Sequence, residues 1–345
     1  YNAGDRQIDN LTYDSREVCA NTLFVCKGAA FKAAYLEQSA ANGAILYVSE
    51  QKYEIGMDIP YILVSNIREA MPYLGRFFYN DPSRAFKLIG VGGTKGKSTT
   101  VYYIKAILDD FLAAGNMPES AMISSIDTYD GVMRYESHIT TPESLELFKH
   151  FRNAADSKIP FLEMEVSSQA LKYNRVDEIL FDVGIFMNIS EDHISPIEHP
   201  DFEDYFASKL KLFAKTKTAL VCTDSEHLER ILQEASAASR VITFGTKAGS
   251  DIYGYHIRKE NHQILFDVYY GEQNLGRIQL HVPGLHNVEN ALAAIAAAYV
   301  FDIPVEYMHS GLFRARSAGR MEAYHSADNK VVAIVDYAHN KLSFE

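Results

Sequence analysis

The stretch best suited to chemistry is a glycine-rich turn, GVGGTKGKSTT, at residues 90–100. It lies between a run that predicts a strand and a run that predicts a helix, which is where a phosphate-binding loop works. Lys97 can neutralise the β- and γ-phosphates, and the hydroxyl of Ser98 can ligate Mg²⁺. Val91 replaces the first glycine of the strict pattern, so the match is to a shorter form. The alternative is a strand–helix turn without a ligand, which is disfavoured because Gly-Lys-Ser-Thr opens the helix. We expect nucleotide phosphates to be held by Gly93, Thr94, Lys95, Gly96, Lys97, Ser98 and Thr99.

Strands and helices alternate around this loop. The runs FKLIGV, AMISSI, FLEMEV, DVGIFMNI and TALVC predict strands that are apolar on both faces, with helices between them. This pattern indicates a mainly parallel, doubly wound sheet that is covered on both sides. Between residues 251 and 283 polar and apolar residues alternate with glycine turns, which predicts an inserted β meander. The Ala-rich ENALAAIAAAYV predicts a buried helix, and KVVAIVDYAHN predicts a further strand.

The first eighty or so residues form a separate α/β pattern. NTLFVCKG, GAILYVS and PYILVS predict strands, whereas FKAAYLEQSAANG and IREAMPYLGRFFY predict helices. The segment NDPSRA contains Pro82 and indicates a domain boundary. We therefore predict an α/β fold with a small domain at residues 1–84, a larger phosphate-loop domain at 85–335, and the start of a linker at 336–345.

Composition excludes several classes of protein. A chain of 345 residues predicts two or more domains. The formal charge of −12 argues against nucleic-acid binding, which relies on clustered Lys and Arg. The three cysteines form no CxxC or His/Cys ligand spacing, which indicates ordinary thiols of a reducing compartment. No apolar stretch reaches the length of about 18 residues that a transmembrane helix needs. The start, YNAGDRQ, lacks an apolar signal core, so we expect a trimmed N-terminus and a cytoplasmic protein.

Several stretches occur in an order that resembles the Mur ligases of peptidoglycan synthesis. They are GGTKGKSTT, HITTPESLEL, LEMEVSSQAL, MNISEDHI, DYFASKLKLF, GLHNVENALAA, SAGRMEA and VDYAHN. The chain is most similar to the MurE type, the UDP-N-acetylmuramoyl-L-alanyl-D-glutamate ligase, and YDSREV with NTLFVCKGA resembles the uridine-nucleotide-binding first domain of that type. The resemblance implies that residues 1–84 bind the UDP substrate, that 85–335 form the central ATPase domain, and that 336–345 begin a linker to a C-terminal domain carrying the amino-acid site.

The family reaction is ATP-dependent amide formation. A substrate carboxylate attacks the γ-phosphate of ATP, and the amine of an amino acid then displaces phosphate from the acyl phosphate. The resemblance therefore implies ATP and Mg²⁺ as cofactors, and UDP-MurNAc-dipeptide and a free amino acid as partners. We expect a monomer with no nucleic acid and no membrane insertion.

The resemblance also assigns the metal-binding and catalytic residues. Glu165 follows a predicted strand, at the sheet edge where ligands bind, and is expected to ligate Mg²⁺ with Ser98. His193 follows the next strand and matches a second-magnesium residue. Lys209 aligns with a lysine that CO₂ carbamylates in the family. Carbamylation suits a metal site because carbamate oxygens bind Mg²⁺ better than an ammonium group does. The alternatives are a solvated carboxylate for Glu165, a structural or exposed histidine for His193, and a lysine on a solvated helix face for Lys209. Lys211 is the nearby competitor for the carbamylated position, but Lys209 follows the Tyr-Phe-Ala-Ser run as the family lysine does. Expected to be catalytic are Lys97, Glu165, His193 and Lys209.

Substrate and nucleotide contacts are carried over in the same way. Positions that resemble muramoyl-peptide or uridine contacts are Ser15, Thr140, Thr141, Ser167 and Arg175. For the two threonines the alternative is an N-cap for the following helix. Positions that resemble ATP contacts are Asn287 and Asn290 for the base and ribose, Arg320 for the phosphates and Asp336 for the ribose. Asn287 could instead be only a helix N-cap.

Three functions stay open at this point. The first is a MurE-type ligase, and the second is a related amide ligase of the MurF or folylpolyglutamate synthase-like type. The third is a nucleotide-binding module that has lost catalysis. The uridine-type N-terminal pattern and the TTP and DYAH stretches argue against the folate alternative. The presence of Lys97, Glu165, His193 and Lys209 together argues against a module without chemistry.

Overall fold

The structure is a computed structural model that describes residues 7–28, 30–192, 194–260, 263–282, 284–316, 322–326, 328 and 330–335. It divides into two compact units. Unit 1 comprises Tyr1–Arg84, Pro142–Arg152 and Ala170–Ile179, and unit 2 comprises Ala85–Thr141, Asn153–Gln169 and Leu180–Glu345. The two short segments of unit 1 that follow residue 84 come from the start of α4 (Ser144–Asp156) and most of α5 (Ser168–Lys172) with its continuation.

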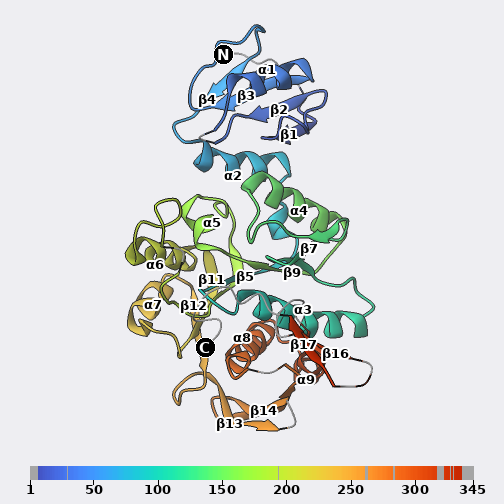
Figure 1. Cartoon of the computed structure of the whole chain (residues 1–345), viewed down its shortest axis with the longest axis vertical. Helices are drawn as coiled ribbons and strands as arrows, with labels where there is room; N and C mark the ends of the chain where they lie inside the picture. The colour runs from blue at the N-terminus through green and yellow to red at the C-terminus, as the bar shows by residue number, and fades with distance from the viewer. Residues whose placement is uncertain are drawn as a thin grey trace. The chain divides into compact units, whose positions relative to one another are not determined.

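Unit 1 is built on a four-stranded parallel sheet in the order β1-β2-β3-β4 (Figure 1). Alternate residues of β2 point to opposite faces, as the two-residue period of a strand requires. Leu23 and Val25 pack with Met71, and Phe24 packs with Leu36. The three predicted strands are confirmed as β2 Thr22–Val25, β3 Ala44–Ser49 and β4 Tyr61–Leu63, and the two predicted helices as α1 Ala33–Ala41 and α2 Ile67–Phe78. The remaining strand, β1 Asn10–Thr12, was not predicted.

Unit 2 contains an eleven-stranded sheet in the order β15-β14-β13-β12-β11-β10-β5-β9-β6-β7-β8. The strands from β13 to β6 along this order pair in parallel, and both outer parts pair antiparallel. The predicted parallel sheet is therefore confirmed, and the predicted meander continues this same sheet, because β13 pairs with β12. The strands are β5 Lys87–Gly92, β6 Ala121–Ile123, β7 Asp127–Tyr129, β8 Arg134–Glu136, β9 Phe161–Glu165, β10 Phe181–Phe186, β11 Thr216–Cys222, β12 Arg240–Gly245, β13 Ile252–Glu260, β14 Gln263–Tyr270 and β15 Gln273–Leu280.

Helices cover both faces of the parallel part. On one face α3 (Lys97–Ala114) packs with α8 (His286–Val300) and α9 (Val305–Arg314), and on the other lie α6 (Phe202–Leu210) and α7 (Leu228–Ala235) (Figure 1). Strand β11 shows the division, because Leu220 belongs to the core under the first group and Val221 to the core under the second. Both faces are apolar for this reason, as the sequence predicts.

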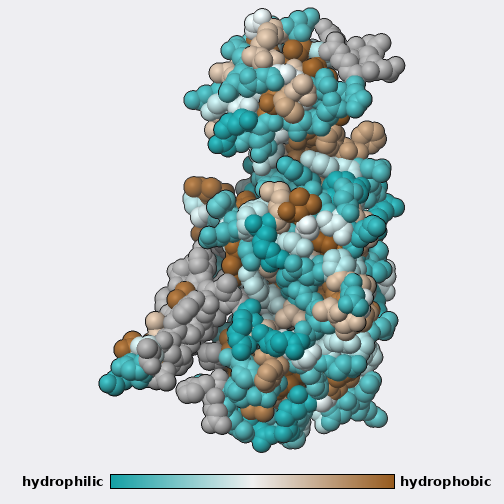
Figure 2. Space-filling view, turned by 90° about the vertical axis from the view of Figure 1, so that its right-hand side faces the viewer, coloured by the Kyte–Doolittle hydropathy of each residue, from teal (hydrophilic) through white to brown (hydrophobic). Residues whose placement is uncertain are grey.

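The remaining elements lie outside these layers. A two-stranded antiparallel pair is formed by β16 (Glu322–His325) and β17 (Val332–Val335), and short 3₁₀ helices cover Pro82–Arg84 and Phe213–Lys215. On the face shown in Figure 2, hydrophilic residues predominate and apolar residues form scattered patches. Within the described part of the chain, no helix is long and apolar enough to cross a membrane.

Strand order creates a place for a ligand. The parallel pairings place β5 between β9 and β10, so these two strands, which are consecutive in the sequence, lie on opposite sides of it. Ligands of open α/β sheets bind beyond the carboxyl ends of strands at such a point. The glycine-rich loop follows β5 at that edge.

Candidate functional site

The glycine-rich loop joins β5 to α3, as the sequence predicts, and its shape requires glycine at two positions. Gly93 and Gly96 have φ values of 138° and 83°, a region that side-chain-bearing residues rarely adopt. A Cβ on Gly93 would lie 2.8 Å from the Cβ of Met187, and one on Gly96 would lie 2.3 Å from Oδ1 of Asn290. The backbone of the loop is therefore closely surrounded on both sides.

The end of β10 holds the loop in place. The backbone N–H of Thr94 donates to the carbonyl of Asn188 at 2.9 Å, and the N–H of Lys95 donates to Oδ1 of Asn188 at 2.8 Å. The hydroxyl of Thr94 lies 3.1 Å from that of Tyr205 on α6. Sequence reasoning missed Asn188 and Tyr205, although a polar residue at the end of an apolar strand is a signal that could have indicated Asn188.

Two lysine amines meet at one carbonyl of the loop. Lys97 donates to the carbonyls of Gly93 and Thr94 at 3.0 and 3.1 Å, and Lys209 donates to the carbonyl of Gly93 at 2.8 Å. Lys209 is only 3% exposed, whereas Lys211 is exposed. Burial and the positive charge of Lys97 hold the pKa of Lys209 well below its usual range, and Asp192 opposes this effect. Because its amine is buried, the solvated helix face that pattern alone favours is wrong for Lys209.

A buried carboxylate lies beside the start of α3. Glu165, at the end of β9, is 1% exposed, so the alternative of a carboxylate in solvent is wrong. Its Oε1 accepts from the backbone N–H and the hydroxyl of Ser125, at 2.8 and 3.0 Å. The Ser125 hydroxyl in turn lies 3.1 Å from that of Ser98. The sequence pattern predicts Ser125 as part of a strand, yet it lies beyond the end of β6, at the same edge as Ser98.

These oxygens fit Mg²⁺. A carboxylate and hydroxyls are hard oxygen ligands of the kind that Mg²⁺ binds together with phosphates. The described residues contain no cluster of three or more His, Cys, Asp or Glu side chains. A metal held here would therefore need oxygens from nucleotide phosphates or water beside Ser98 and Glu165.

The paired threonines differ in their surroundings. Thr141 is fully buried, and its hydroxyl donates to the carbonyl of Glu165 at 2.9 Å and accepts from the N–H of Ser167 at 3.0 Å. Thr140 is half-buried. The helix that follows, α4, begins at Ser144. Thr141 thus fixes the turn that carries both Glu165 and Ser167.

The start of α8 packs against the loop. Asn287 and Asn290 are buried, and Asn290 donates to Oδ1 of Asn287 at 3.1 Å while its Oδ1 accepts from the Thr100 hydroxyl at 3.4 Å. Between them Glu289 lies near Asp224, which follows β11. Burial and the Asp224 charge raise the pKa of Glu289 to about 7, and Lys247 opposes the shift.

Two predicted substrate residues belong to unit 1. The hydroxyl of Ser15 donates to Oε1 of Gln38 at 3.4 Å. Arg175 is buried and pairs with Oε1 of Glu143 at 2.8 Å, and Oε2 of Glu143 pairs with Lys27 at 2.7 Å. Two cations thus converge on one carboxylate in this unit.

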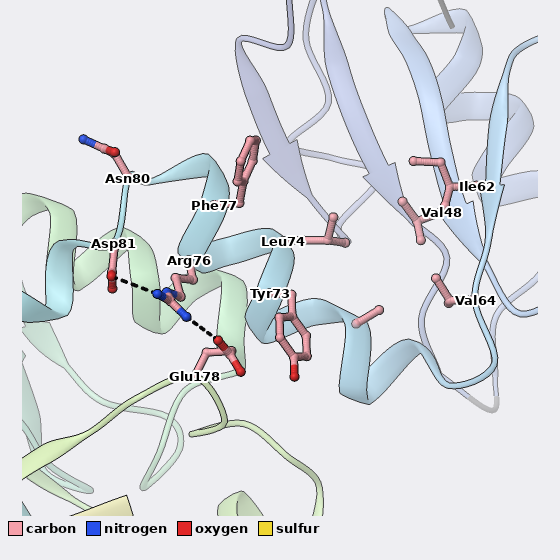
Figure 3. A pocket seen from close by; sticks show the side chains of 11 residues that line it. Val48, Ile62, Val64, Tyr73, Leu74, Arg76, Phe77, Asn80, Asp81 and Glu178 are labelled. Carbon is pink, nitrogen blue, oxygen red and sulfur yellow. Dashed lines mark hydrogen bonds and ion pairs between the residues drawn. The ribbon is translucent and has the colours of Figure 1, made fainter. Parts of the chain in front are cut away.

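Unit 1 also contains a hollow of about 740 Å³. Apolar side chains of β3, β4 and α2 line most of it, and Phe77 stands at its rim with 90% of its surface exposed (Figure 3). At one end Arg76 pairs with Asp81 at 3.1 Å and with Glu178 at 2.5 Å (Figure 3). None of its lining residues is among the predicted site residues. Those residues are Val48, Ile62, Val64, Ala70, Tyr73, Leu74, Arg76, Phe77, Asn80, Asp81 and Glu178.

Three predicted site residues lie outside the described residues: His193, Arg320 and Asp336. Other predicted site residues, from distant parts of the sequence, meet at the carboxyl edge of the unit 2 sheet. They are the loop residues Gly93 to Thr99, with Thr141, Glu165, Ser167, Lys209, Asn287 and Asn290.

Comparison with known proteins places this arrangement in a family. Residues 91–298 match the Mur ligase middle domain. The chain is 39% identical over 350 residues to a UDP-N-acetylmuramyl-tripeptide synthetase of Bifidobacterium longum. It is 38% identical over 344 residues to a UDP-N-acetylmuramoyl-L-alanyl-D-glutamate–L-lysine ligase of Enterococcus faecalis. These alignments cover 99% and 98% of this chain, and the chain spans 66% of the length of each relative.

Solved structures agree in fold. A UDP-N-acetylmuramoyl-L-alanyl-D-glutamate–2,6-diaminopimelate ligase superposes with a TM-score of 0.79 at 21% identity, over 99% of this chain and 70% of that one. A MurF ligase from Thermotoga maritima in complex with ADP superposes with a TM-score of 0.69 at 18% identity, over 99% of this chain and 74% of that one. Because the family model covers more than half of the chain and both curated relatives align with nearly all of it, the chain belongs to the Mur ligase family.

Proposed function

We propose that the protein is an ATP-dependent ligase that adds an amino acid to UDP-N-acetylmuramoyl-L-alanyl-D-glutamate in peptidoglycan synthesis. The observation that carries the proposal is the meeting, at one sheet edge, of the glycine loop, the buried Glu165 carboxylate and the buried Lys209 amine. The names of the two curated relatives support the choice of substrate. The substrate carboxylate would take the γ-phosphoryl group of ATP and release ADP, and the amine would then displace phosphate to form the amide.

The loop would bind and orient the nucleotide phosphates. Its backbone N–H groups and the N-terminus of α3 favour anionic oxygens. Lys97 would leave the carbonyls of Gly93 and Thr94 and neutralise charge on the transferred phosphoryl group, because such transfers depend on positioning and electrostatics. Ser98 and Glu165 would hold Mg²⁺, which would supply positive charge against the nucleotide phosphates. Asn287 and Asn290 would contact the base and ribose from the start of α8.

Lys209 would carry a carbamate. Its depressed pKa favours the neutral amine, whose lone pair is free to attack the carbon of CO₂. The adduct loses one proton and becomes an anion with two oxygens, which suits a cation and removes the repulsion with Lys97. We expect a carbamate signal in a ¹³C NMR spectrum recorded with ¹³CO₂, and we expect the Lys209→Ala variant to lack it. The same spectrum in both proteins would contradict the assignment.

Substrate contacts complete the proposal. Thr140 and Thr141 would bind the muramoyl-peptide, and Ser167 and Arg175 would contact the same substrate. Unit 1 would bind the uridine nucleotide through Ser15. His193, Arg320 and Asp336 keep the metal, phosphate and ribose roles that the resemblance implies. Since the substrates are nucleotides and free amino acids, we place the enzyme in the cytoplasm. The choice of amino acid would lie in the third of the relatives' length that this chain does not span.

The test is a phosphate-release assay on the complete protein with Mg-ATP and UDP-N-acetylmuramoyl-L-alanyl-D-glutamate. Amines are added singly, beginning with L-lysine because the Enterococcus relative is named as an L-lysine ligase, then meso-diaminopimelate and L-ornithine. We expect release that requires both the muramoyl-dipeptide and one amine. Tight ATP binding without release for any amine would refute this substrate and favour another carboxylate or a module without catalysis.

A further inference from the structure

A fully buried imidazole lies in the segment between β10 and α6. Nδ1 of His199 lies 2.6 Å from Oδ2 of Asp204, and Nε2 lies 3.0 Å from Oγ of Ser168. Asp204 is in the first turn of α6, whereas Ser168 opens α5. One side chain therefore joins two segments that are far apart in the sequence.

The joined segments both carry residues of the proposed active site. On α6, Tyr205 contacts Thr94 of the loop through its hydroxyl, and the Lys209 amine lies 4.8 Å from the Tyr205 ring. The ring of His199 packs edge-on against the same Tyr205, with 5.1 Å between centroids. On the other side, Ser168 follows Ser167 and lies three residues after Glu165.

The two ring nitrogens have different roles. A carboxylate only accepts hydrogen bonds, so Nδ1 donates to Asp204. In the neutral ring Nε2 is then an acceptor, and the Ser168 hydroxyl donates to it. The hydroxyl proton of Ser168 therefore points toward His199. This hydrogen bond fixes the rotamer of Ser168, which is next to Ser167 in the sequence.

We propose that His199 is a positioning residue that sets the geometry between Glu165 and Lys209. The inference rests on the proposed function, in which both residues act on the metal-bound phosphates. Catalytic groups must be held within about 0.5 Å of the productive geometry, and they depend on surrounding hydrogen bonds for this. Without the contact between Ser168 and His199, the turn that carries Glu165 would lose its buried tie to the helix that carries Lys209.

Substitutions can remove the contact between His199 and Ser168 while the contact with Asp204 is kept. His199→Asn retains an N–H near the position of Nδ1 and loses the contact with Ser168, and Ser168→Ala loses the same contact from the other side. One lost hydrogen bond corresponds to about a tenfold effect at most. We therefore expect each variant to lower kcat by about five- to tenfold and to raise the Mg²⁺ concentration for half-maximal rate, with an unchanged KM for ATP at saturating Mg²⁺. The double variant should lose no more than either single variant, because both remove one contact.

A neighbouring pair provides the matched control. Nε2 of Gln169 donates to Oε1 of Glu198 at 2.9 Å and joins the same two segments, but both side chains are partly exposed. Glu198→Ala should leave the Mg²⁺ requirement as in the wild type. If His199→Asn lowers the melting temperature while kcat and the Mg²⁺ requirement stay unchanged, His199 is merely structural and the inference is wrong.

A second measurement keeps this test independent of the ligase reaction. The affinity for ADP is measured by calorimetry with Mg²⁺ and with EDTA, in the complete protein. We expect the ratio of the two affinities to fall about five- to tenfold in His199→Asn and to stay unchanged in Glu198→Ala. An unchanged ratio in His199→Asn would overturn the positioning role. A wild type that binds Mg-ADP but joins no amine to the muramoyl-dipeptide would instead count against the proposed function alone.

Discussion

Replacing Gly96 by alanine should destabilise unit 2 and weaken nucleotide binding together. The alanine would have to adopt the φ of 83° that Gly96 has, which costs an L-residue about 1–2 kcal/mol. It would also lie 2.3 Å from Oδ1 of Asn290. That side chain is 3% exposed, so it can move aside only by losing its bonds with Asn287 and Thr100. Two such bonds contribute about 1 kcal/mol each, and with the conformational cost the total loss of stability is about 3–4 kcal/mol.

Gly249 provides the matched control for this change. Its φ is 98°, and nothing lies within 4 Å of the position where a Cβ would be added. Gly249→Ala should therefore carry the conformational cost of about 1–2 kcal/mol without the contact. In thermal melts we expect a fall of about 4 °C for Gly249→Ala and about 10 °C for Gly96→Ala. Calorimetry should show weaker ADP binding only for Gly96→Ala. Equal melting shifts for the two variants, or unchanged ADP affinity in Gly96→Ala, would refute the argument.

Three further changes test other parts of the site. Lys97→Ala should lower the rate of phosphate release about 10²–10³-fold with an unchanged circular-dichroism spectrum, because transferred charge loses its counter-ion; full turnover would exclude that role. The pKa of Glu289 rises from 4.5 to about 7 in the fold, so its contribution to stability is complete below pH 4.5 and is lost as the pH rises through 7. Glu289→Gln should thus be more stable than wild type by about 3 kcal/mol at pH 8 and equal at pH 4, in denaturation curves at both pH values; a constant difference would contradict this. Thr141→Val should lower stability by about 2 kcal/mol and raise the KM for the muramoyl-peptide, since Ser167 N–H and Glu165 C=O lose their partner, whereas Thr141→Ser should resemble wild type.

The sequence by itself determined the elements and the position of the loop. Strand and helix periods, glycine punctuation and doubly apolar strands are local signals, and the structure confirms the parallel sheet, both sets of covering helices and the β5–α3 loop. The carboxyl end of a strand can also be read locally. For this reason Glu165 could be assigned to the edge where ligands bind before its neighbours were known.

Only the tertiary structure decided which side chains meet. Ser125 joins Ser98 to Glu165, and Lys209 reaches the carbonyl of Gly93 across 116 residues of sequence. The helix pattern around Lys209 favours a solvated amine, whereas the fold buries it. Strand order and the crossing of β10 to the far side of β5 bring α6 over the loop, and no local period encodes that order. The low pKa of Lys209 depends on its removal from water, which occurs only when these distant segments pack together, so the sequence alone could not predict it.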